Sequence, residues 1–518
     1  MPKVLFKILV TTDLHAQVTE DPPNRRPGLA KLAAYVAKLR TKGPVILLDA
    51  GDLVSGSLYG AFDHGRTLAS LYATLGYRAL LPGNHDFDYC PEENDPLYYF
   101  RRLLPLLSSQ SGATPRVLAL NLAYQGLSLA ESAKPLILSL KPKVAVIGVM
   151  NPLTHRPSLG PILNDFDFGL KKDLATTKSD LLSLVATTLA PLAQDDGQTI
   201  VLAHLGDLPQ GYRGFNVDPK LNLNDSPLGP DLAALPGATL VIDGHSHRPV
   251  PPHRPRDLGQ YVNLGQGGES LAEITVFKDA PLVLKIIPYE RVAKMTPEPV
   301  LAKKIDSLNE SLGLNDQLVV LPCDPTYSLK DLWRAITPLG QLVVEAMSAA
   351  TAADLAFLNK GALRAGLEGV VTVGSLAAVL PFDDLLFKTR LTGQKIYDLL
   401  VYFLNKGFLG LPLYHGLSLW TYPMGETLSL AGASLNDGSE LSLTQPYSLA
   451  ISGQMVRLLA ADILEEPQER GRLLAAIVNH IKARANEPYL HDPHLNPYHY
   501  YSTQEAATIA FATRKERP

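Results

Sequence analysis

The segment VILLDAGD, from Val45 to Asp52, has the pattern of a short strand buried on both faces and followed at once by carboxylates. Four consecutive apolar residues are typical of a strand inside a parallel sheet. In open α/β folds, ligands bind just beyond the carboxyl ends of such strands. One aspartate in that position is more often a turn residue or a helix cap, so the segment gains meaning only from its recurrence.

The same pattern occurs at four further apolar runs, at residues 4–10, 79–83, 199–203 and 238–242. The polar residues that follow these runs are Asp13 and His15, the stretch Asn84 to Asp88, His204, and the stretch Asp243 to His247. Oxygen and imidazole ligands without a thiolate suit Mn, Zn, Fe or similar divalent ions. Seven of the Asp, Asn and His side chains in these stretches are candidate ligands. Seven ligands are too many for one tetrahedral site but suit two ions that share a carboxylate. We expect Asp52, from the middle of the set, to be that bridge.

Composition limits the classes of protein to consider. The chain has 518 residues, of which 46% are hydrophobic and 19% charged, as in soluble globular proteins with two or more domains. Its net charge of -4, with no basic block, argues against a nucleic-acid groove. Cys90 and Cys323 lie in different halves, which argues against a disulfide framework.

Hydropathy argues against a membrane span, because no apolar stretch reaches the roughly 18 residues that one needs. Met1 to Val10 is too short for a signal peptide and is itself predicted to be a strand. The sequence as given therefore favours a cytoplasmic protein, or a periplasmic or secreted one if a leader was removed.

Periodicity gives the coarse organisation of the first half. A helical pattern at 29–39 between two strands indicates a strand-helix-strand unit with parallel pairing. Further helices are predicted at 66–75, 97–106 and 174–192, and further strands at 117–120 and 144–149. Segments 261–264 and 271–277 alternate as antiparallel strands do. This mixture suggests two sheets packed face to face, with helices outside.

The second half is predicted to be a separate domain. We place a first domain at 1–295, a linker helix region at 296–325 and a second domain at 326–518. In the second domain, helices are predicted at 332–349, 393–404 and 471–484, and strands at 355–358, 385–390, 417–422 and 448–451.

With these residues placed, the chain resembles the two-domain 5'-nucleotidase family of the calcineurin-like metallophosphoesterases. The matching blocks, in family order, are Thr12-Asp13-Leu14-His15, Gly51-Asp52, Gly83-Asn84-His85-Asp86-Phe87-Asp88, Ala203-His204 and Gly244-His245-Ser246-His247. In the second half, Asn359-Lys360-Gly361-Ala362-Leu363-Arg364, Leu380-Pro381-Phe382 and Leu391-Thr392-Gly393 resemble family blocks, and the resemblance fades after about Tyr447. It implies an N-terminal four-layer α/β/β/α metallophosphoesterase sandwich plus a C-terminal α/β 5'-nucleotidase-type domain.

The resemblance also implies roles for individual residues. One metal would be held by Asp13, His15, Asp52 and His247, and the other by Asp52, Asn84, His204 and His245. His85 would contact the phosphate and assist the leaving group, steered by Asp88, with Asp86 the less favoured partner. Asn359, Arg364 and, more weakly, Arg334 are predicted substrate contacts, because an arginine fork binds phosphate or carboxylate well. A turn-stabilising role is the alternative for Arg364.

The predicted function is metal-dependent hydrolysis of a small phosphorylated metabolite, by default a nucleotide, through attack of a metal-bridging hydroxide. Two cations can generate the nucleophile and neutralise the phosphoryl oxygens. Nucleotidases of this group stack the base between two aromatic rings, but here Leu411 and the stretch Ser452 to Met455 replace the family's residues. The alternatives are a 2',3'-cyclic nucleotide phosphodiesterase, a thiosulfohydrolase-like enzyme, or a binding protein of the same fold without turnover.

Other polar residues have plainer interpretations. Asp243 and Asp207 lie close to predicted ligands but are more simply loop residues, as are His155 and Asn121. The tail from Tyr489 to Tyr501, with its three histidines His491, His494 and His499, is expected to be a docked aromatic tail rather than a third metal site, because prolines break the spacing.

Overall fold

The fold is described from a computed structural model of the chain. It describes residues 2–22, 24–89, 95–108, 112–125, 127–128, 131–152, 166–169, 174–206, 228–255, 258–321, 327, 337–382, 384–405, 411–424, 427–459, 464–487, 490, 498–500 and 503–512. The chain divides into two compact units, Met1–Leu308 and Asn309–Pro518, each described by itself. This division lies inside the predicted linker region, and the roles assigned to the two domains stay predictions.

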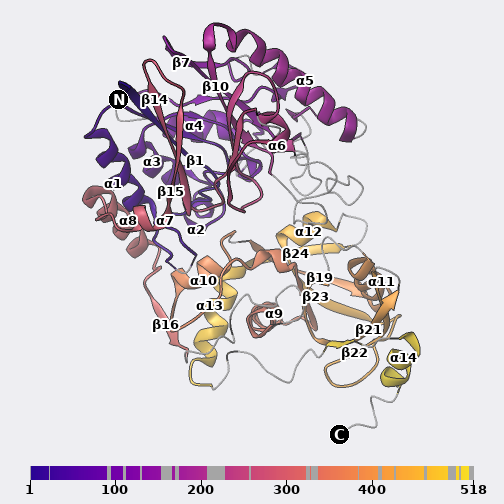
Figure 1. The fold of residues 1–518 in the computed structure, drawn as a ribbon. Helices are drawn as coiled ribbons and strands as arrows, with labels where there is room; N and C mark the ends of the chain where they lie inside the picture. The colour runs from indigo at the N-terminus through magenta and orange to yellow at the C-terminus, as the bar shows by residue number, and fades with distance from the viewer. Residues whose placement is uncertain are drawn as a thin grey trace. The chain divides into compact units, whose positions relative to one another are not determined.

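Two six-stranded sheets form the centre of the first unit (Figure 1). In the first sheet, β1, β2, β3 and β4 run parallel, while β14 and β15 continue the sheet antiparallel beside β1. Their bounds are β1 Val4–Thr11, β2 Val45–Asp49, β3 Tyr77–Leu80, β4 Arg116–Val117, β14 Ser270–Phe277 and β15 Val283–Pro288. The parallel pairing predicted from the strand-helix-strand unit is confirmed for β1 and β2.

The second sheet has the order β12-β13-β11-β10-β8-β7. Its parallel centre comprises β8, β10, β11 and β13, with antiparallel strands at both edges. The bounds are β7 Leu136–Leu140, β8 Lys143–Met150, β10 Gln198–His204, β11 Ala238–Asp243, β12 Val250–His253 and β13 Gln260–Asn263. The antiparallel interpretation was therefore only half right for 261–264, since β13 is parallel to β11 and antiparallel only to β12.

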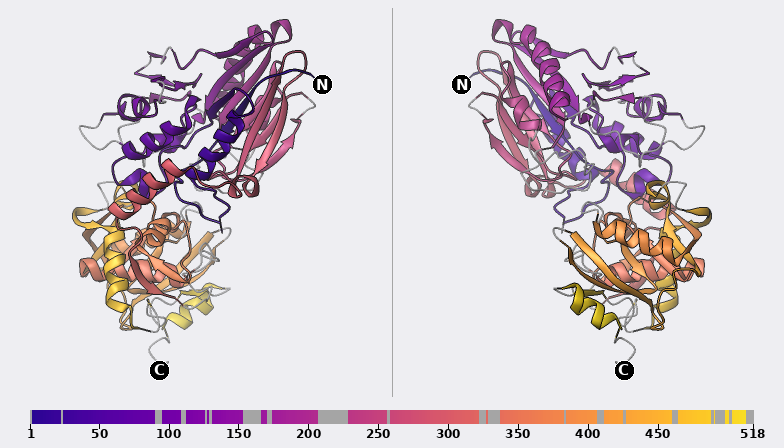
Figure 2. Two further views of the ribbon diagram at one scale, coloured as in Figure 1. Left: turned by 90° about the vertical axis from the view of Figure 1, so that its left-hand side faces the viewer. Right: turned by 90° about the vertical axis from the view of Figure 1, so that its right-hand side faces the viewer.

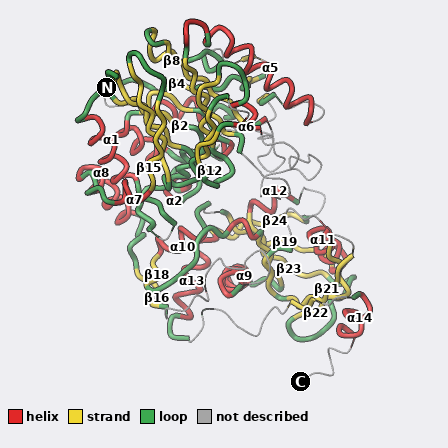
Figure 3. The backbone as a smooth tube through the Cα atoms, viewed as in Figure 1, coloured by secondary structure: helices red, strands yellow, loops and turns green. Residues whose placement is uncertain are grey.

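Alternation along the strands creates one core between the sheets and another beneath the helices. Ile8, Leu48 and Ile200 belong to the core between the sheets, whereas Ile147 and Val201 belong to a second core with α5 and α6. Figure 3 shows the strands of this unit between helices on both sides. The helices are α1 Leu29–Arg40, α2 Leu58–Ala61, α3 Arg66–Tyr72, α4 Leu104–Leu106, α5 Leu174–Leu192, α6 Leu228–Ala233, α7 Tyr289–Ala293 and α8 Pro299–Ser311. The four-layer α/β/β/α prediction is confirmed.

Two segments of the first unit differ from their predictions. The region 97–106 has a π-helix at Tyr99–Leu103 followed by α4, in place of one regular helix. The predicted strand 117–120 shortens to β4, while a small sheet forms from β5 Ala123–Tyr124, β6 Leu127–Ser128 and β9 Phe166–Asp167. Short 3-10 turns lie at Ala73–Leu75, Asn84–Phe87 and Gln194–Asp196.

The second unit is built on a mixed five-stranded sheet of order β20-β17-β23-β19-β24. Within it β17 and β23 are parallel, so both end at the same edge. A three-stranded sheet β22-β21-β25 and a two-stranded sheet β16-β18 complete it, and α14 packs on β21 and β22 (Figure 2). The strands are β16 Gln317–Val320, β17 Leu355–Leu358, β18 Val370–Thr372, β19 Leu385–Thr392, β20 Leu413–His415, β21 Leu417–Met424, β22 Thr427–Leu435, β23 Pro446–Ser452, β24 Glu465–Arg472 and β25 Tyr498–Tyr500. The helices are α9 Pro338–Thr351, α10 Val373–Val379, α11 Gly393–Asn405, α12 Gly453–Leu458, α13 Leu473–Arg484 and α14 Gln504–Ala512, with a 3-10 turn at Lys360–Ala362.

Candidate metal centre

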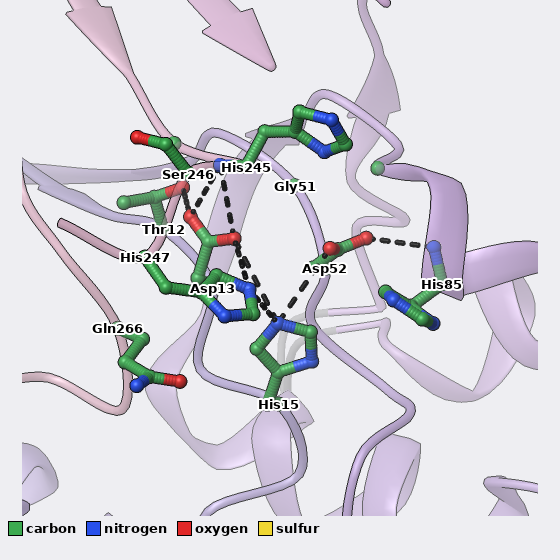
Figure 4. A network of polar contacts seen from close by, with 12 residues as sticks. Thr12, Asp13, His15, Gly51, Asp52, His85, His245, Ser246, His247 and Gln266 are labelled. Carbon is green, nitrogen blue, oxygen red and sulfur yellow. Dashed lines mark hydrogen bonds and ion pairs between the residues drawn. The ribbon is translucent and has the colours of Figure 1, made fainter. Parts of the chain in front are cut away.

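The carboxyl ends of the parallel strands bring the first group of predicted ligands together (Figure 4). Ligand atoms of Asp13, His15, Asp52 and His247 all lie within 4.8 Å of one another. The Nε2 atoms of His15 and His247 are 2.8 Å apart, and Nε2 of His247 lies 3.4 Å from Oδ1 of Asp13. Such convergence of carboxylates and imidazoles on one point is what a divalent cation requires.

A second group shares Asp52 with the first. Ligand atoms of Asp52, His204 and His245 also lie within 4.8 Å of one another. Nε2 of His204 is 3.1 Å from Oδ2 of Asp52. The peptide N–H of His85 donates to Oδ1 of Asp52 at 2.8 Å, which brings the loop of Asn84 against the same carboxylate. The structure thus gathers the predicted ligands around Asp52, and their role as ligands stays a prediction.

Hydrogen bonds orient two of the imidazoles. Nδ1 of His15 donates to the carbonyl oxygen of Ser55 at 3.0 Å, and Nδ1 of His204 donates to the carbonyl oxygen of Ala50 at 2.9 Å. A carbonyl only accepts, so in each ring Nε2 is left to bind a cation.

Buried polar atoms support the fit of a metal. Asp52 Oδ2, Asn84 Oδ1 and His204 Nε2 are buried and make no well-formed hydrogen bond among the described residues. Asp52 Oδ2 and His204 Nε2 face each other at 3.1 Å, whereas Asn84 Oδ1 has no donor among the described residues, and burying a polar atom in this way is costly. Their chemistry, a carboxylate oxygen, an amide oxygen and an imidazole nitrogen, is a donor set for Mn, Zn or Fe.

The pKa values of His204 and His15 are shifted by burial and by the charges around them. Burial lowers the pKa of His204, but the carboxylates of Asp52 and Asp13 outweigh it and raise that pKa to about 10. Burial, together with His247, lowers the pKa of His15 to about 3. The two carboxylates therefore require a cationic partner, which a proton on His204 or a metal ion can supply.

Two glycines allow the carboxylates to lie this close to the neighbouring loops. A Cβ atom on Gly83 would lie 2.1 Å from Oδ1 of Asp52, and one on Gly244 would lie 2.1 Å from Oδ2 of Asp13. Neither contact is possible for a larger residue, so the glycines before Asn84 and His245 are needed for the geometry of the site.

Backbone strain is concentrated at the predicted ligands. Positive φ angles of 47° to 70° occur at Asp13, His15, Asp52, His245 and His247. The left-handed region is unfavourable for residues other than glycine, and such strain is often retained at functional sites.

Two further buried carboxylates, those of Asp86 and Asp243, accept hydrogen bonds from the loops that carry the predicted ligands. Asp86 accepts hydrogen bonds from the peptide N–H groups of Asp52, Leu53, Val54 and Gly83. Burial and the charge of Asp52 raise the pKa of Asp86 to about 7, against the lowering by those N–H groups. Asp86 therefore supports the Asp52 turn, a role different from the one considered for it.

Asp243 has the equivalent position in the second sheet. Its Oδ1 accepts from the N–H groups of Leu205, Gly206 and Gly244, and its Oδ2 accepts from the Tyr261 hydroxyl at 2.9 Å. It thereby ties the loop after His204 to the loop that carries His245. The supporting role that the sequence disfavoured for Asp243 is the one that the structure gives it.

We expect Asp243→Ala to lower both stability and metal content. The change leaves three buried N–H groups without an acceptor, at about 1–3 kcal/mol each. Asp243→Asn is the matched control, because an amide oxygen can still accept these bonds. Metal analysis and thermal unfolding should show a large loss for alanine and a small one for asparagine. Wild-type metal content and melting temperature in Asp243→Ala would refute the role.

His85 and Asp88 form the predicted pair beside this centre. Nδ1 of His85 lies 2.8 Å from Oδ2 of Asp88, and about a fifth of each side chain is exposed. Asp88 therefore fixes the tautomer in which Nδ1 carries the hydrogen and Nε2 is the working nitrogen. The choice of Asp88 over Asp86 as the contact of His85 agrees with this geometry.

The predicted substrate residues are described within the second unit alone. Asn359 follows β17 and donates from Nδ2 to Oε1 of Gln454 at 3.3 Å. The guanidinium of Arg364 lies 5.3 Å from the ring centre of Phe382, and its side chain is exposed. Arg334 lies outside the described residues. Substrate contact therefore stays a prediction for all three.

The structure also places the residues at the family's aromatic positions. Leu411 packs against the core of the second unit, and Met455 is 1% exposed within that core. Tyr414, close to Leu411 in the sequence, is fully buried in β20 and presents no ring for stacking.

The remaining residues considered from the sequence have structural or undescribed positions. Asn121 donates to the carbonyl oxygens of Met150 and Phe168 and so joins the end of β8 to the residues after β9. Those outside the described residues are Cys90, His155, Asp207, Cys323, His491 and His494. His499 lies in β25, which pairs with β21. Sequence reasoning missed Ser55 and Asn263, whose contacts with the ligand loops leave no signal in a pattern of apolar runs.

Comparisons with known proteins agree with this arrangement. The calcineurin-like phosphoesterase model matches residues 6–249, and the 5'-nucleotidase C-terminal domain model matches residues 323–452. The trifunctional nucleotide phosphoesterase of Bacillus subtilis (strain 168) is 26% identical over 443 residues, which are 76% of this chain and 27% of that protein. The chain thus spans about a quarter of that relative's length.

Solved structures share the fold over nearly the whole chain. A 5'-nucleotidase precursor from Thermus thermophilus has a TM-score of 0.63 at 18% identity, covering 96% of this chain and 99% of that one. A sulfate thiohydrolase from the same species has a TM-score of 0.62 at 16% identity, covering 97% of this chain and 98% of that one. At these identities the likeness establishes the fold alone. Within the part of the chain that is described, no helix has the length and apolar character that crossing a bilayer demands.

Proposed function

This chain belongs to the two-domain 5'-nucleotidase family of the calcineurin-like metallophosphoesterases, and from that membership we propose that it hydrolyses phosphoesters of small metabolites with the help of divalent metal ions. The observation that carries the proposal is the pair of ligand groups that share Asp52, with His85 and Asp88 beside them. We propose two ions, the first held by Asp13, His15, Asp52 and His247 and the second by Asp52, Asn84, His204 and His245.

The donor set supports a metal such as Mn, Zn or Fe. When bound, two such ions would lower the pKa of a water and neutralise charge on the phosphoryl oxygens. The chain's own residues supply the rest of the chemistry. His85, with Nδ1 held by Asp88, donates a proton from Nε2 to the leaving oxygen as the P–O bond breaks, and the carboxylate of Asp88 stabilises the charged imidazole.

A nucleotide is the default substrate, because it is the substrate class of the family. In the second domain, Asn359 and Arg364 are proposed to contact it, with the exposed guanidinium of Arg364 suited to a phosphate. The half-buried Leu411 and the buried Met455, neither of which has an aromatic ring, favour a second candidate, a phosphoester whose leaving group is not a base. Base stacking on an aromatic ring is worth roughly 1–3 kcal/mol per base, so its loss would weaken the preference for nucleotides.

A substrate panel tests the proposal. The Mn-loaded protein should hydrolyse at least one class among nucleoside 5'-monophosphates, 2',3'-cyclic nucleotides and sugar phosphates, and chelation should abolish the activity. Added Mn should also raise the melting temperature, because it binds the folded state alone. A preference for sugar phosphates over nucleotides would select the second candidate. If the protein binds Mn but hydrolyses no ester of the panel, the remaining interpretation is a binding protein of the same fold.

A further inference from the structure

Ser55 connects the metal centre with the His85–Asp88 pair. It lies between β2 and α2, three residues after Asp52, and is 1% exposed. Its carbonyl oxygen accepts the Nδ1 hydrogen of His15 at 3.0 Å, whereas its hydroxyl donates to Oδ2 of Asp88 at 2.7 Å. The backbone and the side chain of one residue thus contact the two parts of the site separately.

The Ser55 hydroxyl donates to the same carboxylate oxygen of Asp88 that contacts His85. Oδ2 of Asp88 accepts from Nδ1 of His85 at 2.8 Å and from Oγ of Ser55 at 2.7 Å. The Tyr89 side chain is hydrogen-bonded to that of Ser55, and burial raises the pKa of the Tyr89 phenol, which keeps it a neutral donor. A hydrogen-bonded chain therefore runs from Tyr89 through Ser55 to Asp88 and ends at His85.

The loop itself has other supports. Asp86 accepts from the N–H groups of Leu53 and Val54, and the hydroxyl of Ser57 donates to the carbonyl oxygen of Ala16 at 2.7 Å. Removing the Ser55 hydroxyl leaves these contacts and the carbonyl contact with His15 in place. The hydroxyl is consequently needed for the position of Asp88 rather than for the path of the chain.

We propose that Ser55 is a positioning residue, which holds Asp88 so that the His85 imidazole keeps the orientation needed to donate to the leaving oxygen. This inference rests on the proposed function, in which His85 protonates the leaving group. Two donors on one oxygen restrict the rotation of a carboxylate more than one donor does. Because hydrogen bonds to charged groups are among the strong ones, the effect on turnover is measurable.

The test compares Ser55→Ala with Ser57→Ala, which removes a hydroxyl from the same loop without touching Asp88. On adenosine 5'-monophosphate, whose alkoxide leaving group needs a proton, Ser55→Ala should lower kcat roughly tenfold with KM unchanged. On p-nitrophenyl phosphate, whose leaving group departs without a proton, the loss should be less than about twofold. Ser57→Ala removes a support of the loop but no contact of Asp88, so any loss should be equal on both esters, and all variants should keep their metal content.

Two kinetic outcomes would overturn the inference. An equal loss on both esters would indicate a general disturbance of the site. A further loss when Ser55→Ala is added to His85→Ala would mean that Ser55 does not act through the imidazole, because coupled residues give non-additive effects.

A spectroscopic readout separates this inference from the proposed function. In the zinc-loaded protein, the Nδ1–H proton of His85, identified by its loss in His85→Ala, should be visible by NMR. It should persist in Ser57→Ala and broaden or vanish in Ser55→Ala. An unchanged signal in Ser55→Ala would refute the positioning role. If the wild-type protein hydrolyses neither of these esters nor any phosphoester of the substrate panel, the proposed function fails and this signal alone decides the role of Ser55.

Discussion

Asp52→Asn is expected to lose tightly bound metal and, with it, nearly all turnover. Asp52 is the one carboxylate common to both ligand groups among the described residues, and its replacement removes a negative charge from both. Metal ions supply several kcal/mol of transition-state stabilisation, and each 1.36 kcal/mol is about tenfold in rate, so activity should fall by about a thousandfold or more. Asparagine tolerates the left-handed backbone at this position, where φ is 56°, so the fold should survive.

Asp49→Asn is the matched control. Asp49 is buried on the same segment, and burial raises the pKa of its carboxyl well above the usual value. It accepts hydrogen bonds from Thr11 and from the N–H of Gly51, contacts that an amide can largely preserve. Metal analysis should find both ions in Asp49→Asn. If Asp52→Asn bound two ions with wild-type affinity, Asp52 would not be the bridging ligand.

His85→Ala is expected to keep its metals but lose most of its turnover. The contact of this residue with Asp52 is made by its peptide N–H, which alanine retains. Loss of a positioned general acid typically costs roughly 10²–10⁴-fold. Measurements of kcat on adenosine 5'-monophosphate and of metal content test both halves of this prediction. His253→Ala, at an exposed histidine of β12, should leave both unchanged. Full activity in His85→Ala would remove His85 from the mechanism.

The sequence was informative wherever burial imposes a pattern. The strands that carry Asp13, Asp52 and His204 are apolar runs because both of their faces are covered, and their carboxyl ends follow from parallel pairing. Because these ends meet at one edge of each sheet, the grouping of polar residues could be anticipated before any coordinates.

The supporting contacts could not be anticipated in the same way. Asp86 and Asp88 are two residues apart and chemically identical, yet one accepts from four peptide N–H groups and the other from an imidazole. The path of the chain after β3 decides which of the two aspartates accepts from the peptide N–H groups and which from the imidazole. A pattern of residue types does not contain that path, so the sequence favoured Asp88 as the contact of His85 but did not predict the contacts of Asp86 with the peptide N–H groups.

The strand β24 illustrates a different limit. Its sequence Glu-Glu-Pro-Gln-Glu-Arg-Gly-Arg has no apolar alternation, because the strand is at a sheet edge and nearly all of its side chains face water. Only its backbone pairing with β19 makes it a strand. Charged residues on an edge discourage pairing with other chains, which explains such a composition but does not predict the strand.

The left-handed backbone at five predicted ligands has a consequence for engineering. Glycine at any of these positions relieves strain, so a search guided by heat resistance alone would tend to accept changes that erase the ligands. More heat-resistant variants obtained in this way would then be inactive. Laboratory evolution of the chain should therefore select for retained metal at every round, and melting temperature should rank only the survivors.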